Sequence, residues 1–263
     1  MKNVYIKITI LLSILFSSLS AVDNNVSAPS SAAMHLIDIA GKQRMLSQRM
    51  AKDYMYGGNK IATSKADKQL KSSIGEFSNS HKNLLNSIND EEIRNLLEFV
   101  NMSMEEFKEI TNKQFDQDNA QLALDLSESI LEGSQYVVDS IKKSTNHKES
   151  DIIEKSGKQR MLAQRIAKYY IAYQSGIKDK NTVSQMKEAV VLFTNNHKDL
   201  MSNKNNTTTI NQKLNKINKL WKIVYKFYLN IEKGGLPFIV YTTTDDITKK
   251  MDEITKLYVE LYK

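Results

Sequence analysis

The sequence predicts an all-α protein built from two tandem antiparallel four-helix bundles that form a pseudo-dimer within one chain. Three observations support this fold class. Apolar residues recur with helical periodicity along most of the chain, and no strand pattern is sustained. Only two prolines, Pro29 and Pro237, occur in 263 residues. A twelve-residue block also occurs twice, and the two copies are separated by 157 − 41 = 116 residues.

The repeated block indicates a duplicated module. Residues 41–52 (GKQRMLSQRMAK) return as residues 157–168 (GKQRMLAQRIAK), with ten of the twelve positions identical. A second match, FSNSHK at 77–82 against FTNNHK at 193–198, keeps the same offset. Two separated matches at one offset are typical of an internal repeat. We therefore predict one bundle over residues 30–147 and a second over residues 148–263.

The first twenty residues have the character of a secretory signal peptide. Lys2 and Lys7 supply a basic start, residues 8–16 supply an apolar core, and Ser18 and Ser20 supply small residues for cleavage. The apolar run is too short for a membrane-spanning helix. We expect a protein exported to the periplasm, which stays tethered to the membrane if the signal at residues 1–20 is not cleaved.

Four helices are expected in the first bundle. The first covers about 32–56 and ends at the glycine pair 57–58, because glycine favours helix termini. The second covers about 64–88. The third follows the break at 89–90, where Asp90 can cap it, and the fourth follows a turn near 116–119.

The second bundle is expected to repeat this plan. Its first helix should end near Gly176, and the Asn- and Thr-rich stretch 202–209 predicts a loop. Residues 234–237 (GGLP) predict the break before the last helix.

The junction between the bundles decides whether the two blocks meet. Residues 144–146 (STN) disfavour helix, and Asp151 with Glu154 resembles a capping pair. A turn there places the two block helices side by side and parallel, whereas a continuous helix makes a rod that separates them. We favour the turn. Pairing within a monomer and pairing between the chains of a homodimer both stay open.

The block has two faces on a helical wheel. Arg44, Met45, Gln48 and Lys52 lie within about 60° of Gly41, and the opposite side carries an ordinary apolar core stripe. A glycine inside a helix costs about 1 kcal/mol relative to alanine. It is tolerated where a ligand or another backbone must approach closely.

Arginine on this face indicates anion binding. Asp38 and Glu154 are expected to pair with Lys42 and Lys158 four residues later, which leaves the arginines uncompensated. Two facing guanidinium groups repel each other, and a small anion between them would remove that repulsion. The candidate ligand-binding residues are Gly41, Arg44, Met45, Gln48, Gly157, Arg160, Met161 and Gln164. Arg49 and Arg165, further round the helix, either flank the site or reach solvent.

Other functions have little support in the sequence. We find no nucleophile–base pair, metal-ligand spacing or phosphate-binding loop, so we expect no enzyme, metal or cofactor. The chain has no cysteine and a net charge of +7. Without the signal the charge is 35 − 30 = +5, a mild excess that suits an anionic ligand. No basic run with interleaved aromatics indicates nucleic-acid binding.

Both blocks resemble the signature of the PilJ-type sensor domain of type IV pilus chemotaxis transducers. They are also similar to the P-box of nitrate/nitrite sensor kinases: Gly41, Arg44, Met45 and Arg49 match it, and the second copy matches at residues 157, 160, 161 and 165. The resemblance implies periplasmic four-helix bundles that pair and hold one nitrate between two P-box helices. The residues that would hold it are Arg44 and Arg160.

We therefore expect a sensor that captures nitrate, nitrite or a similar small oxyanion. It would signal to a membrane partner, a sensor kinase or a chemoreceptor. The alternative is a structural or adaptor protein that pairs with the ectodomain of such a receptor without binding a ligand. The chain departs from the receptors of the family, since both copies of the motif lie on one polypeptide.

Overall fold

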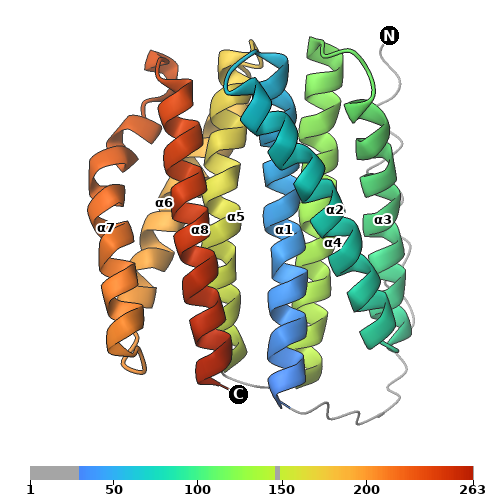
Figure 1. Ribbon diagram of the computed structural model, residues 1–263, viewed down its shortest axis with the longest axis vertical. Coiled ribbons are helices and arrows are strands. Elements are labelled where there is room, and N and C mark those ends of the chain that lie inside the picture. Colours follow the sequence, from blue (N-terminus) through green and yellow to red (C-terminus); the bar gives the residue numbers. More distant parts are fainter. Residues whose placement is uncertain (1–29, 146–148, 263) are drawn as a thin grey trace.

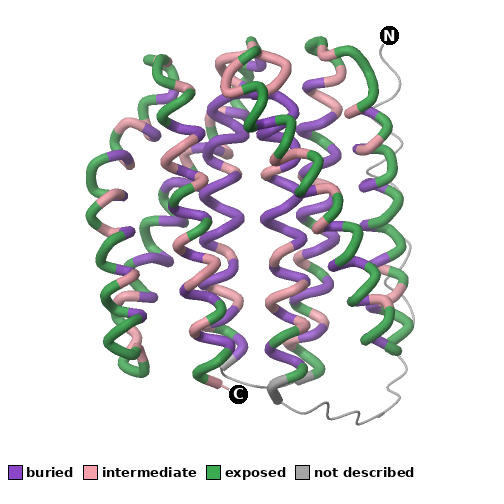
Figure 2. Tube along the Cα trace, in the orientation of Figure 1, coloured by how far each residue is buried: buried purple, intermediate pink, exposed green. Residues whose placement is uncertain are grey.

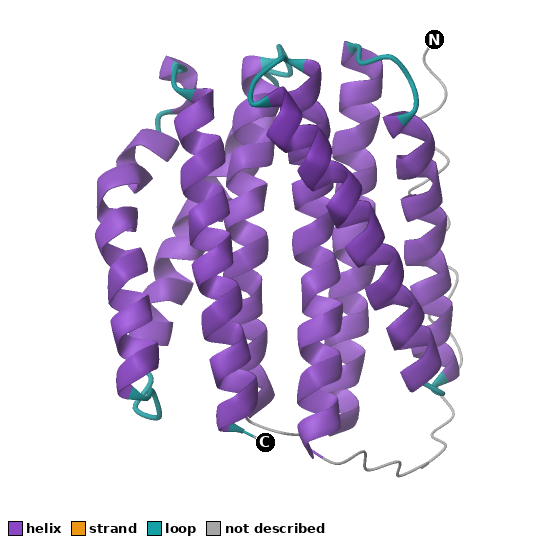
Figure 3. Cartoon of the chain, in the orientation of Figure 1, coloured by secondary structure: helices purple, strands orange, loops and turns teal. Residues whose placement is uncertain are grey.

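The computed structural model describes residues 30–145 and 149–262, and these residues are helical apart from short connections (Figure 3). The predicted signal peptide lies outside them. None of the described helices is long and apolar enough to cross a membrane. The elements are α1 (Ser30–Gly58), α2 (Thr63–Ser87), α3 (Glu91–Thr111), α4 (Gln117–Thr145), α5 (Glu149–Gln174), α6 (Lys180–Met201), α7 (Thr208–Tyr228), the 3-10 turn η2 (Ile231–Lys233) and α8 (Pro237–Leu261).

The eight helices form two antiparallel bundles, α1–α4 and α5–α8, that pack against each other along α1 and α5 (Figure 1). α4 packs on α1, and α8 packs on α5. The α2–α3 pair and the α6–α7 pair lie at opposite edges of the molecule (Figure 1). The predicted all-α fold with an intrachain pseudo-dimer is confirmed.

The chain turns between the bundles. α4 ends at Thr145 and α5 begins at Glu149, so that α5 runs parallel to α1 and beside it (Figure 1). Residues 146–148 themselves lie outside the described residues. The turn that we favour is thus present, and the two repeated blocks meet within one chain.

Side-chain caps explain several helix starts. Asp90 accepts a hydrogen bond from the backbone amide of Ile93 at 2.9 Å, and Asp179 accepts one from Thr182 at 2.9 Å. Such bonds satisfy amides that have no partner within the helix. α8 begins at Pro237, where the missing N–H is no loss.

Burial corrects one expectation about the block. The wheel predicts one core face, but α1 and α5 are buried on nearly all sides because they form the centre of the molecule (Figure 2). Leu46 and Met50 are fully buried, and so are Arg44 and Arg160. A fully buried guanidinium needs charged or hydrogen-bonding partners.

Candidate functional site: a buried arginine pair

The structure brings the two glycines and the two arginines of the block together. A methyl group added at Gly41 would lie 3.1 Å from Arg44 Nη2 and 3.8 Å from Arg160 Nη2. One added at Gly157 would lie 3.1 Å from Arg160 Nη2 and 4.0 Å from Arg44 Nη2. Both guanidinium groups thus lie close to both glycines. The missing side chains make room for them at the α1–α5 interface.

Each arginine bonds an acid from the other block helix. Arg44 Nη1 donates to Glu154 Oε1 at 2.8 Å, and Arg160 Nη2 donates to Asp38 Oδ1 at 2.6 Å. Because Asp38 and Glu154 occupy equivalent positions in the two copies, these contacts form a pseudo-symmetric pair across the interface.

The fourth helix of each bundle supplies a further acceptor. Arg44 Nη1 also donates to Gln135 on α4, and Arg160 Nη1 donates to Asp252 Oδ1 on α8 at 2.7 Å. Gln135 and Asp252 lie 252 − 135 = 117 residues apart, close to the offset of the block. The site therefore draws on α1, α4, α5 and α8.

The expected pairing of Asp38 with Lys42 and of Glu154 with Lys158 is wrong. Lys42 forms an ion pair with Glu76 at 3.0 Å, where both side chains are partly exposed. Both acids instead reach across to the buried arginines. A buried charge gains more from compensation than a solvated lysine on the helix surface does.

The arginine charges are therefore compensated by the protein, and the expectation of uncompensated repulsion is wrong. Burial favours the neutral form of Glu154, but the Arg44 charge outweighs it and holds the pKa of Glu154 below its usual value. Burial would also raise the pKa of Asp252, but Arg160 and Lys256 together outweigh it and lower that pKa. The side chains of Asp38, Glu154 and Asp252 are 16%, 14% and 25% exposed, so the acids border water.

Three donors of the pair have no acceptor among the described residues. They are Arg44 Nε, Arg44 Nη2 and Arg160 Nε, all shielded from solvent. Buried polar groups in folded proteins almost always have a hydrogen-bonding partner. Unpartnered donors beside a second guanidinium are the chemistry that an oxyanion would satisfy.

The other candidate residues of the block are also buried. Met45 and Met161 are buried. The amides of Gln48 and Gln164 bond the fourth helices: Gln48 Nε2 donates to Ser127 O at 3.0 Å, and Gln164 Nε2 donates to Thr248 Oγ1 at 2.7 Å. No hydrogen bond joins either amide to an arginine of the pair.

The candidate flanking residues Arg49 and Arg165 lie partly exposed. Arg165 forms an ion pair with Glu128 at 2.7 Å and donates to Gln185 at 2.6 Å. Arg49 Nε has no hydrogen-bond acceptor among the described residues. Arg165 thus links α5 to both α4 and α6.

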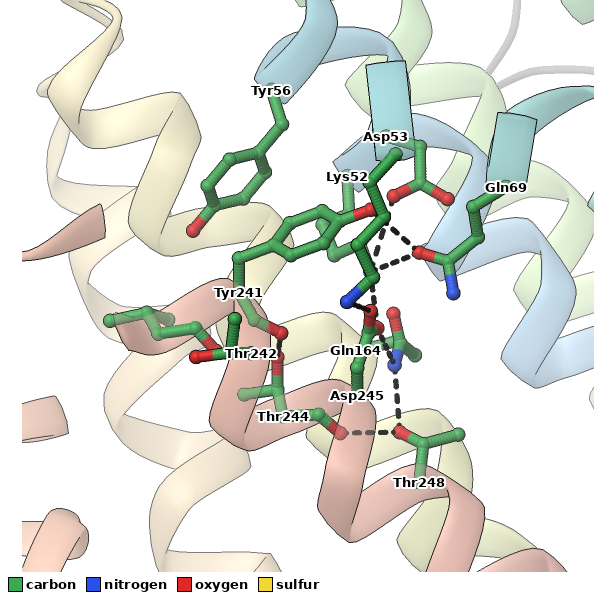
Figure 4. Close-up of polar contacts among 12 residues, drawn as sticks. Lys52, Asp53, Tyr56, Gln69, Gln164, Tyr241, Thr242, Thr244, Asp245 and Thr248 are labelled. Atoms are coloured by element: carbon green, nitrogen blue, oxygen red, sulfur yellow. Dashed lines mark hydrogen bonds and ion pairs between the residues drawn. The ribbon is translucent and has the colours of Figure 1, made fainter. Parts of the chain in front are cut away.

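Lys52, the last residue of the first block, lies in a second buried polar cluster (Figure 4). Lys52 Nζ donates to Asp245 Oδ1 on α8 at 2.6 Å and to Gln69 Oε1 at 3.0 Å. It also lies 3.2 Å from Asp53 Oδ1 and 4.2 Å from the centre of the Tyr241 ring. Burial raises the pKa of Asp53 to about 7. The Lys52 charge acts against this rise, and the Asp245 charge adds to it.

Lys168 makes a corresponding ion pair with the fourth helix of the other bundle. Its Nζ donates to Ser127 Oγ on α4 at 3.0 Å and to Glu128. Burial lowers the pKa of Lys168 to about 8, against the opposing effect of Glu128. Each lysine therefore connects its own bundle to the fourth helix of the other bundle. Together the two lysines stabilise the interface between the bundles.

Sequence reasoning missed the partners on the fourth helices. Gln135 and Asp252 carry no recognisable motif, and neither do Glu128 and Asp245. Their spacing offered a signal, because the two members of each pair (Gln135 with Asp252, and Glu128 with Asp245) are 117 residues apart. A comparison of polar residues between the two copies of the fourth helix would have found them.

The fold and the site define a class: paired helical bundles with a polar centre at the bundle interface. The chain belongs to the PilJ family, described as type IV pili methyl-accepting chemotaxis transducer N-term, which matches residues 26–129 and 144–231. This confirms the predicted resemblance and assigns a sensor-type domain, which suggests a sensory or signalling role. No curated protein and no solved structure matches the chain.

Proposed function

We propose that this chain is an exported sensor that binds nitrate, nitrite or a similar small oxyanion between Arg44 and Arg160. It would report occupancy to a membrane partner, a chemoreceptor or a sensor kinase. The observation that carries the proposal is the convergence of two buried guanidinium groups over Gly41 and Gly157, where three donors have no acceptor among the residues that the structure describes. The sensory character of the family supports it.

The carboxylates act as competitors of the ligand. Arg44 and Arg160 are held by Glu154, Asp38 and Asp252, and Asp252 also pairs with Lys256 at 2.8 Å. A planar oxyanion matches the guanidinium fork and would take over some of these hydrogen bonds. The acids border water and can turn toward it as the anion enters.

This exchange supplies a route for signalling. Glu154 and Asp38 link α1 to α5, so releasing them removes two ties between the bundles. A ligand shifts an equilibrium between two states by its differential affinity for them. The anion favours the arrangement in which the arginines bind it instead of the acids, and the membrane partner detects the altered packing.

The expected affinity is modest. Nitrate has four heavy atoms, and a ceiling of about 1.5 kcal/mol per atom limits binding to roughly 6 kcal/mol, a dissociation constant of tens of micromolar. Competition from the carboxylates weakens binding further. We expect a dissociation constant between about 50 μM and 1 mM.

Calorimetric titration of the purified protein with nitrate tests the proposal, with nitrite and chloride as comparison ions. The double variant Arg44→Gln with Arg160→Gln should bind none of them. The matched control Lys42→Gln removes a block charge that pairs with partly exposed Glu76, and should bind as the parent does. Absence of heat, together with an unchanged Tm at millimolar nitrate, would reject the proposal.

A pull-down with a receptor ectodomain of the family separates the sensor from the adaptor. The sensor predicts that association depends on the anion and that the double arginine variant loses this dependence. Association that is indifferent to the anion would favour the adaptor.

A further inference from the structure

The outer helices α3 and α7 are equivalent in the two bundles but carry opposite charge. In α3, six glutamates against Arg94 and Lys108 give a net charge of −4. In α7, five lysines and no acid give a net charge of +5. The mild positive charge of the whole chain hides this separation.

The change in the sign of the charge is confined to the solvent-exposed faces of α3 and α7. The buried positions correspond at an offset of 117 and stay apolar: Ile93 with Ile210, Leu97 with Leu214, and Val100 with Ile217. At the same offset, exposed Glu105 corresponds to Lys222, and exposed Glu109 corresponds to Lys226. The two copies have therefore kept the packing face and diverged to opposite signs on the solvent face.

The helices α3 and α7 lie at opposite edges of the molecule (Figure 1), and exposed residues recur along both of them (Figure 2). On α7 the exposed lysines form no ion pair within the described residues; they are Lys216, Lys219, Lys222 and Lys226. On α3 the same holds for the exposed glutamates Glu91, Glu92, Glu98, Glu106 and Glu109.

Each charged face also exposes apolar side chains. Ile223 on α7 is 77% exposed, and Met102 and Phe99 on α3 are 71% and 45% exposed. Apolar contacts framed by complementary charge are typical of protein interfaces. The two helices have 21 residues each, about 32 Å at 1.5 Å per residue, so the faces match in length.

We propose that a second copy of this chain docks its acidic α3 face on the basic α7 face of the first. The helices run in the same direction in the molecule, so a sideways translation places α3 of one copy beside α7 of the next (Figure 1). The contact is heterologous and leaves one face free at each end, so copies form rows.

A second copy fits better than an anionic lipid surface. A lipid surface would account for the lysines of α7 but not for the matching acidic face on α3. One helix face per partner makes a small interface, so the association is weak and sensitive to salt. This inference goes beyond the proposed function and does not depend on anion binding.

Sedimentation velocity of the full chain, over a range of concentrations, tests the inference. Association should be evident at about 50 mM salt and at least tenfold weaker at about 500 mM. The variant with Lys219, Lys222 and Lys226 changed to Glu should sediment as a monomer. The variant with Glu98, Glu106 and Glu109 changed to Lys should do the same.

A mixture of the two variants gives the decisive test. The variant with lysines on α3 carries two basic faces, and the variant with glutamates on α7 carries two acidic faces. Each contact between the two variants therefore joins a basic face to an acidic one. An equimolar mixture should associate where each variant alone does not. The control, with Lys68, Lys71 and Lys82 on exposed parts of α2 changed to Glu, should associate as the parent does. A monomeric parent at low salt, or a mixture that stays monomeric, overturns the inference. So does lysine-dependent binding to vesicles of anionic phospholipid without self-association.

Discussion

Glu154 offers the sharpest test of the competition between carboxylates and anion. Its Oε1 lies 2.8 Å from Arg44 Nη1, and the side chain is 14% exposed. We predict that Glu154→Gln strengthens nitrate binding, because it removes a negative charge from the edge of the arginine pair while keeping a hydrogen-bond acceptor. In the absence of anion the same change should destabilise the fold, since an ion pair is lost.

The magnitudes follow from the geometry. An anion on Arg44 would lie roughly 5 Å from the Glu154 carboxylate, and two unit charges at that distance repel by about 3 kcal/mol at an effective dielectric constant of 20. Access to water reduces this to about 1.5 kcal/mol, or about tenfold in affinity. A hydrogen bond to a charged group contributes about 1.5–3 kcal/mol, and the glutamine retains part of it, so unfolding should be easier by about 1–2 kcal/mol.

Isothermal titration with nitrate and urea unfolding measure the two effects on the same preparation. The control Glu76→Gln removes an equal charge from a partly exposed ion pair with Lys42 and should change neither quantity by much. Weaker nitrate binding in Glu154→Gln would refute the reasoning, because it would mean that Glu154 orients Arg44 for the ligand instead of competing with it.

Three further predictions concern the block and its lysine cluster. Gly41→Ala should weaken nitrate binding at least tenfold, because its methyl group crowds Arg44. The control Gly75→Ala, whose methyl group meets nothing within 4 Å, should leave nitrate binding intact and raise stability by about 1 kcal/mol. Equal nitrate binding by both variants would contradict this prediction. The folded chain holds the Asp53 proton up to about pH 7, whereas the unfolded chain loses it near pH 4, so stability falls across that window. The free energy of unfolding in urea should be lower at pH 8 than at pH 5 in the parent, and this difference should be absent in Asp53→Asn. The same pH dependence in both proteins would contradict the prediction. Because the pKa of Lys168 falls to about 8, stability should rise from pH 8 toward pH 10.5, and Lys168→Met should lose this rise.

Much of the fold follows from the sequence. The repeat of residues 41–52 at 157–168 determines the number of bundles, because two copies of one module adopt one structure. Helix limits follow from local chemistry at residues such as Asp90 and Pro237. These features depend on neighbours in sequence, which is why they could be predicted.

The partners of the arginines could not be predicted in the same way. A helical wheel gives the angle of Asp38 and Arg44 round one helix, but not which helix lies opposite. Asp38 is four residues from Lys42, and that local pairing is available in any isolated helix. The structure prefers the contact with Arg160 because burial makes compensation of that charge more valuable.

The surroundings of the central helices were underestimated for a related reason. Amphipathic analysis assumes one buried face, whereas α1 contacts α2, α4, α5 and α8. Residues such as Lys52, which would ordinarily reach solvent, are buried there and bond Asp245 of the other bundle. Polar residues in a repeated block are thus a sign of an interface as well as of a ligand site.

A crystal structure of the protein grown with nitrate tests the central claim most directly. We predict a planar anion between the guanidinium groups of Arg44 and Arg160, bonded to donors that now lack acceptors, with the Asp38 or Glu154 carboxylate turned toward solvent. Arginines still bonded to Glu154, Asp38 and Asp252 at saturating nitrate, with no anion between them, would contradict the account.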